Sequence, residues 1–186
     1  MLIKILNIYL LFTCILASSI ESDLILNKQL NYNLEFKGIS AGSAFIQLNE
    51  NINNDRELIL KSELITNRFT DFFYKIRDYI TVTMNRDDIS LITLNKEVNE
   101  GNFKKKIHIE IVNDTIKNLI NNNNLIIKES IYSPLSIIYA LRKEKLNVND
   151  IHSYNIYNNG KIKKISVITI GNQKISSPFG TYDTIV

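Results

Sequence analysis

Tryptophan is absent from this chain of 186 residues, and cysteine, proline and glycine are scarce, with one, two and six residues. The single cysteine, Cys14, excludes an intramolecular disulfide, so a packed core has to hold the fold together. A chain of this length buries about 70% of its unfolded surface, which is enough without a cross-link. A large excess of charge of either sign is also absent, because 22 basic residues nearly balance 19 acidic ones. The net charge of +3 at pH 7 does not indicate a nucleic-acid partner.

The N-terminus has the pattern of a signal peptide over residues 1–19. Lys4 precedes a short apolar run, and Ala17 and Ser19 stand at the spacing of a cleavage site. The run is shorter than the roughly 20 apolar residues that a spanning helix needs. We therefore expect export to the periplasm or cell envelope. A lipid anchor on Cys14 is disfavoured, because the residues before it are not the small ones that lipidation requires.

The rest of the chain, residues 20–186, predicts a single β-rich domain. Apolar and polar residues alternate with period two along many short segments, such as 30–36, 79–85 and 106–111. The pair Asn159–Gly160 predicts a two-residue hairpin turn. We count nine or ten antiparallel strands. Sequential amphipathic strands of this kind favour a strongly curved antiparallel sheet or an open barrel.

One segment departs from this alternation and predicts the main helix, near residues 134–146. Ser133 is a good N-cap, Pro134 suits the first helical position, and apolar residues follow at helical spacing. We expect this helix to cover the apolar face of the sheet. A second helical turn is expected within residues 66–76.

Gly38 and Gly42 lie four residues apart between two strand patterns. We expect both to flank a sharp bend, where glycine permits positive φ or a bulge without steric cost. A phosphate-binding glycine loop would need a helix after the glycines, and a strand pattern follows instead.

Three stretches in the correct order, "YNLEFKGISAGSAFIQL", "SPLSIIYALR" and "PFGTYDTIV", resemble the bacterial exported family known as domain of unknown function 3108. The resemblance covers most of the chain after residue 19. It implies a mostly β, barrel-like envelope domain without an assigned activity. Members of that family usually carry further strands after the position of Val186, so either this chain lacks the last strands of the domain or its barrel closes with fewer strands.

No catalytic, cofactor-binding or metal-binding constellation is visible in the sequence. His108 and His152 are the only histidines and no cysteine lies near them, so we expect no metal site. Ser136 has no local base and no nucleophile-elbow pattern around it. Arg142 is expected to clamp the helix to the sheet through a carboxylate, with Asp78 and Asp150 as candidates, or through carbonyls, and ligand contact is the alternative role.

Two functions remain open, and both are non-catalytic. The first is a periplasmic protein that holds a lipid or another amphipathic ligand between sheet and helix. The candidate wall residues are Tyr139, Leu135, Phe72 and Phe73. The second is an assembly module that docks an envelope partner, for example in surface polysaccharide export, through a strand edge or the lysines at 104–106. A periplasmic hydrolase ranks last. A continuous apolar pocket above about 300 Å³ would favour the first function, and a packed interior with an exposed apolar edge would favour the second.

Overall fold

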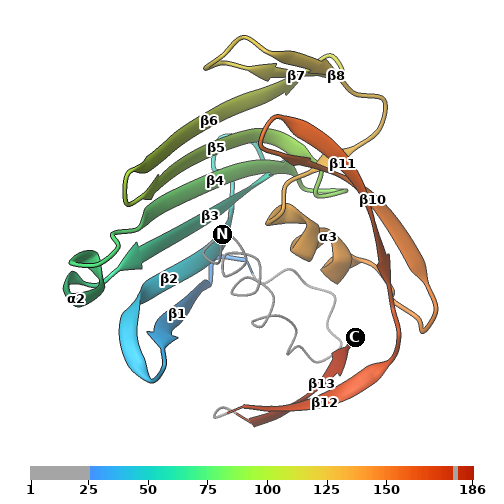
Figure 1. Ribbon diagram of the computed structural model, residues 1–186. Coiled ribbons are helices and arrows are strands. Elements are labelled where there is room, and N and C mark those ends of the chain that lie inside the picture. Colours follow the sequence, from blue (N-terminus) through green and yellow to red (C-terminus); the bar gives the residue numbers. More distant parts are fainter. Residues whose placement is uncertain (1–25, 178–179) are drawn as a thin grey trace. The chain divides into compact units, whose positions relative to one another are not determined.

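A computed structural model describes residues 26–177 and 180–186, which form thirteen strands and two short helices (Figure 1). The expected signal peptide, including Ala17 and Ser19, lies outside the described residues. The chain divides into two compact units. The larger unit holds the described residues through Glu144 together with Ser153–Ile165, and the smaller holds Lys145–His152 and the described part of Ser166–Val186. The expectation of a single domain over 20–186 stays a prediction.

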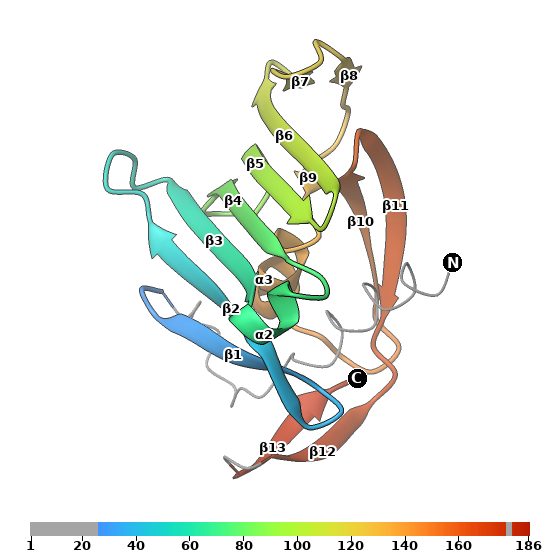
Figure 2. The ribbon, with the colours of Figure 1, turned by 60° about the vertical axis from the view of Figure 1, so that its left-hand side comes forward.

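The larger unit is built on an eight-stranded antiparallel sheet whose strand order is the order of the chain. Its strands are β1 (Gln29–Phe36), β2 (Ile39–Glu50), β3 (Glu57–Thr66), β4 (Arg77–Asn85), β5 (Leu91–Glu100), β6 (Phe103–Val112), β7 (Thr115–Asn118) and β8 (Asn124–Ile126). Figures 1 and 2 show that the sheet is strongly curved. The predicted fold class is confirmed, and among the described residues the sheet stays open, with β1 and β8 at its two edges.

The alternation of apolar and polar residues along the strands determines which side chains form the core of this unit. Residues two apart along each strand point to the same face, and on one face they are almost fully buried. The buried set on this face includes Leu48, Leu58, Leu60, Val82, Met84, Leu94, Ile107 and Ile109. Helix α3 (Ser136–Lys143) lies on the concave side of the sheet (Figure 1) and buries Ile137, Tyr139 and Ala140. The interior of the larger unit is therefore closed by α3, as the sequence predicted.

Helix α3 is shorter than the predicted 134–146, and two buried serines fix its start. Ser133 Oγ accepts a hydrogen bond from the Ser136 amide at 2.9 Å, and Ser136 Oγ accepts one from the Ser133 amide at 2.8 Å. This reciprocal pair satisfies amides that a helix start leaves without partners. The helix ends at Glu144, whose backbone is extended. Lys143 Nζ then donates to the carbonyls of Arg86 at 2.9 Å and Asp87 at 2.7 Å, which ties the helix to the β4–β5 turn.

A second, three-stranded sheet follows the helix, in the order β11, β10, β9. Its strands are β9 (Ile131–Tyr132), β10 (Ile151–Asn158) and β11 (Lys161–Ile168). The turn between β10 and β11 has Asn159 at φ 52° and Gly160 at φ 82°, which confirms the predicted two-residue hairpin turn. The β9–β10 pair is parallel, whereas the sequence pattern predicted antiparallel strands only. Strands of two to four residues, such as β7, β8 and β9, explain why the expected count of nine or ten was too low.

The smaller unit contains the hairpin of β12 (Asn172–Ser177) and β13 (Gly180–Ile185). Its loop near residue 150 is ordered by a carboxylate. Asp150 Oδ2 accepts hydrogen bonds from the Asn147 amide at 2.7 Å and from Asn147 Nδ2 at 2.9 Å, and these bonds hold the pKa of Asp150 below its usual value. The amide of Asn149 donates to the Thr169 carbonyl at 2.7 Å.

The two closely spaced glycines have different roles, and only one lies in the turn. Lys37 (φ 52°) and Gly38 (φ 77°) form the two-residue turn between β1 and β2. Gly42 lies inside β2, opposite Leu34, where the register of β1 shifts. A Cβ at Gly42 would lie 2.2 Å from the carbonyl oxygen of Ile65 on β3. Gly38 thus supplies the predicted positive φ, and Gly42 lies at the register irregularity, as the alternative of a bulge predicted. Gly42 is also needed for the close approach of a neighbouring strand.

Candidate docking surface

The connection between β3 and β4 begins with a short helix, α2 (Arg68–Asp71), in the position where the sequence predicted one turn. Asn67 caps it, because its side-chain oxygen accepts a hydrogen bond from the Thr70 amide at 2.9 Å. The same residue ties the connection to β2: its Nδ2 donates to the Ser40 carbonyl at 2.6 Å and its amide to the Ala41 carbonyl at 2.9 Å. The connection is thus anchored at its start.

A polar network anchors the other end of this connection. Arg77 binds Asp71 with both terminal nitrogens, at 2.5 and 3.1 Å, and Thr66 Oγ1 donates to the same carboxylate at 2.5 Å. The hydrogen bond from Arg77, followed by the one from Thr66, holds the pKa of Asp71 below its usual value. The same ion pair raises the pKa of the Arg77 guanidinium. Bidentate pairs of this kind have fixed geometry, so the base of the connection is well defined.

Three phenylalanines project from this anchored base into solvent. Phe69, Phe72 and Phe73 are 62%, 86% and 70% exposed. Phe73 makes edge-to-face contacts with both of the others, with ring centroids 5.6 Å from Phe69 and 5.2 Å from Phe72. Large apolar side chains are normally buried, and a contiguous exposed group marks an interaction surface.

Two neighbouring turns extend this surface at the same end of the sheet (Figures 1 and 2). The β1–β2 turn carries exposed Phe36 and Ile39 on either side of its two central residues. The β5–β6 turn carries exposed Phe103, and its Gly101 amide donates to the Lys75 carbonyl of the β3–β4 connection at 2.8 Å. We call the exposed set the aromatic tip. Its members are Phe36, Ile39, Phe69, Phe72, Phe73 and Phe103.

Four exposed cations flank the aromatic tip, and the carboxylates of Glu35 and Glu100 lie in the same flanks. Lys37, Arg68, Lys75 and Lys104 are all exposed and belong to the same three connections or their flanks. In the described part of the chain, no carboxylate lies within 4 Å of any of these four cations. Lys37 Nζ lies 5.6 Å from the centroid of the Phe36 ring, close enough for a cation–π contact. The tip thus combines apolar rings with cations that are free to meet anions.

A carboxylate with a perturbed pKa lies behind the tip, on the concave face of the sheet. Burial raises the pKa of Asp78 to about 6, and the carboxyl group of Glu100 raises it further, against the lowering effects of the Asn99 amide and Lys96. The Asn99 amide donates to Asp78 Oδ1 at 3.0 Å. Asp78 lies on the same face of the sheet as Leu64, the residue opposite it on β3, and as Ile80, two positions further along β4. This end of the concave face therefore mixes charged and apolar side chains.

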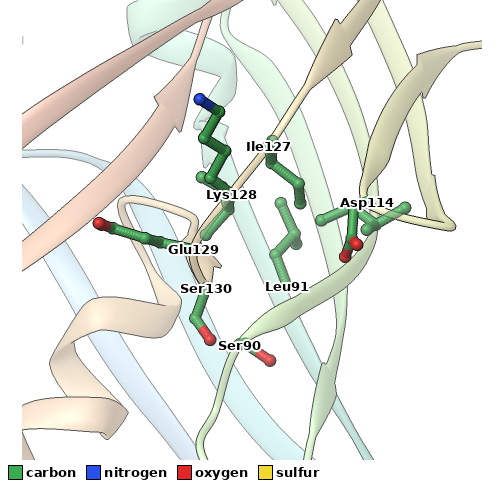
Figure 3. Close-up of a pocket in the computed structure, with 9 residues that line it drawn as sticks. Ser90, Leu91, Asp114, Ile127, Lys128, Glu129 and Ser130 are labelled. Atoms are coloured by element: carbon green, nitrogen blue, oxygen red, sulfur yellow. The ribbon is translucent and has the colours of Figure 1, made fainter.

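Two shallow pockets lie in the larger unit. The first, of about 280 Å³, lies between the end of β8 and the start of β5 (Figure 3). Asp114 and Glu129 lie on opposite sides of it, and Ser130 Oγ donates to Asp88 at 3.2 Å. The lining residues include no histidine or cysteine. A second pocket of about 250 Å³ lies beside Asn67 and Gly42. Neither pocket is a continuous apolar cavity of the size expected for a buried lipid.

The candidate wall residues do not form one site. Tyr139 and Leu135 are buried in the core, each 6% exposed, whereas Phe72 and Phe73 belong to the aromatic tip. Ser136 is fully buried and its hydroxyl is used in the start of α3. The sequence had offered Phe72 and Phe73 as candidate wall residues of a ligand site between sheet and helix. The missed signal was their place in a connection without strand alternation.

The sequence suggested Asp78 or Asp150 as partners of Arg142, and this clamp stays a prediction. The Arg142 side chain is half-buried on α3, and among the described residues no carboxylate lies within 4 Å of it. The expected partner Asp78 accepts the amide of Asn99 instead, and Asp150 accepts from Asn147 within the smaller unit. The lysine next to it, Lys143, makes the connection from the helix to the sheet.

His108 lies on β6 between buried isoleucines and is half-buried. Residues 26–177 and 180–186 bring together no group of three or more His, Cys, Asp or Glu side chains that could hold a metal ion. Within the same ranges, no helix has the length and apolar character needed to cross a bilayer.

The fold and the surface together define a mainly β module with an open antiparallel sheet, a helix on its concave face and an exposed aromatic end. The chain belongs to a family described as protein of unknown function, DUF3108, whose model matches residues 31–186. The searches of curated proteins and of solved structures found no match. The family resemblance seen in the sequence is thereby confirmed.

Proposed function

We propose that the protein is a non-catalytic interaction module of the cell envelope that docks through the aromatic tip. The exposure of Phe72 and Phe73, 86% and 70%, on a connection anchored at both ends is the observation that supports this function most directly. Fully burying a phenylalanine gains about 1.5 to 3 kcal/mol. Burying the exposed parts of Phe69, Phe72 and Phe73 would therefore contribute about 3 to 7 kcal/mol to docking, before the costs of association.

The anchoring of the tip adds to this argument. A docking surface loses less entropy on binding when its backbone is already ordered. Asn67 and the Thr66–Asp71–Arg77 network order this connection in the free protein. Exposed rings without a binding role would not need a connection whose backbone is anchored at both ends.

Protection of the tip in intact envelopes tests the proposal. In a Cys14→Ser background, the chain with Phe72→Cys carries one thiol, and a maleimide reagent should label it rapidly in the purified protein. In envelopes from cells that express the chain, we expect labelling to slow at least tenfold. The matched control is Ile52→Cys, at a position that is 97% exposed in the β2–β3 loop. Equal labelling of position 72 in both preparations would refute docking through the tip.

A second function is favoured by the mixed concave face. Half-buried Leu64, Ile80 and Lys96 lie there with Asp78, an arrangement suited to an amphipathic ligand with a polar head. This site was the first expectation from the sequence, although the pockets are smaller than that expectation required. Native mass spectrometry of protein purified from its own envelope tests it. A co-purifying lipid would support the carrier, and repeated preparations without one would count against it.

A further inference from the structure

We infer that the aromatic tip inserts into the surface of an anionic phospholipid bilayer. This inference rests on the proposed docking function and names its partner. The occupant is a lipid surface because of three features of the tip, which are its chemistry, its backbone and its charge.

The inserted side chains carry no hydrogen-bonding groups. Phe69, Phe72 and Phe73 offer only rings, so a partner needs no matching donors or acceptors. Phe72, at 86% exposure, stands clear of its own chain and forms a projection rather than a groove. A fluid acyl region closes around such a projection without a preformed pocket, as it does around interfacial aromatic residues.

Several backbone amides of the β3–β4 connection already have hydrogen-bond acceptors, which favours entry into an apolar environment. The amides of Asp71, Phe73 and Tyr74 donate to carbonyls within the connection, at 2.9, 2.9 and 2.8 Å. The Thr70 amide donates to the Asn67 side chain. Backbone groups without partners are costly in lipid, and these amides would enter with their hydrogen bonds already made.

Charge then selects anionic headgroups. Arg68 and Lys75 flank the three rings within the same connection, and Lys37 and Lys104 stand on the two neighbouring turns. When the rings enter the boundary between headgroups and acyl chains, these cations come level with lipid phosphates. A protein groove with acidic walls is the other occupant of suitable charge, and the experiment separates it from lipid.

The absence of tryptophan makes a local optical test available. Phe72→Trp places a single indole at the most exposed ring of the connection, and Ile52→Trp places one at the matched control position in the β2–β3 loop. With vesicles of phosphatidylglycerol and phosphatidylcholine, we expect a blue shift of indole emission at position 72 and quenching by brominated acyl chains. The indole at position 52 should keep its emission. Because the reporter is local, binding through another segment would leave position 72 unchanged.

Variants then measure what each part of the tip contributes. In the Phe72→Trp chain, Phe73→Ser should lower the vesicle partition constant about tenfold, the effect of losing one buried ring. Arg68→Gln and Lys75→Gln should each lower it about fivefold, whereas Lys117→Gln, an exposed cation on β7, should not. Vesicles of phosphatidylcholine alone should bind the chain at least tenfold more weakly than anionic vesicles.

Each outcome decides a different point. Unchanged emission at position 72 with anionic vesicles would overturn bilayer insertion. If the thiol at position 72 were nevertheless protected in envelopes, docking would stand and its partner would be a protein. Equal blue shifts at positions 72 and 52 would also overturn the inference, since adsorption would not be specific to the tip. Equal affinity for neutral and anionic vesicles would overturn the role of the cations.

Discussion

Replacing Asp78 by asparagine should stabilise the protein at neutral pH and leave its stability unchanged in acid. Burial raises the pKa of this carboxyl group from 3.8 to about 6, so at pH 7 folding holds a charge in a partly desolvated site. A shift of about two units corresponds to about 3 kcal/mol, and screening at this half-exposed position reduces it to about 1 to 1.5 kcal/mol. Asparagine keeps the oxygen that accepts the Asn99 amide and removes the charge.

The sign follows from the direction of the shift. A carboxyl group whose pKa is raised on folding is protonated in both states well below pH 3.8, where it costs nothing, and its cost is complete only well above pH 6. Urea unfolding at about pH 2.5 and about pH 7.5 measures the difference between Asp78→Asn and the unchanged chain. Asp55→Asn, in the exposed β2–β3 loop, is the matched control. A gain of equal size at both pH values, or a loss at pH 7.5, would refute the reasoning.

Three further predictions concern the fold. Gly42→Ala should cost about 2 kcal/mol or more in urea unfolding, because its Cβ would meet a β3 carbonyl at 2.2 Å, whereas Gly171→Ala, with open space around it, should change stability by less than about 0.5 kcal/mol. Ser133→Ala should cost about 1 to 2 kcal/mol by leaving the buried Ser136 amide without its acceptor, and an unchanged urea midpoint would contradict this role. Asp71→Asn should speed hydrogen exchange in residues 67–74 at pH 7. Since the pKa of Asp71 is lowered on folding, this difference should vanish as the pH falls well below 4, and its persistence there would exclude the carboxylate as the cause.

Local patterns predicted the elements of the larger unit well, because their causes are local. Alternation along β6 placed Ile107 and Ile109 on the buried face, and Asn159–Gly160 fixed a hairpin turn by its backbone preference. The serine and proline at 133 and 134 marked the start of the helix to within two residues. The role of Gly42 was not predictable in this way, since it depends on a carbonyl of a strand 23 residues later.

The candidate site was the part that the sequence could not supply. Whether Phe72 and Phe73 are buried depends on what packs against their connection, and no local pattern contains that information. Their neighbours Asn67 and Arg77 instead hold the connection to β2 and to its own base. The same limit applies to Asp78, whose raised pKa arises from burial and from Glu100, 22 positions away in the chain.

The order of the eight-stranded sheet has a consequence for how the chain folds. Each strand from β2 to β8 pairs with the strand made just before it, so every pairing closes a short loop and folding proceeds through contacts that are near in sequence. A chain that is synthesised from its N-terminus onward can therefore extend the sheet one hairpin at a time. Helix α3 is made only after all eight strands. Until then the apolar side of a nearly complete sheet faces water, and this interval is when the nascent protein is most exposed to aggregation.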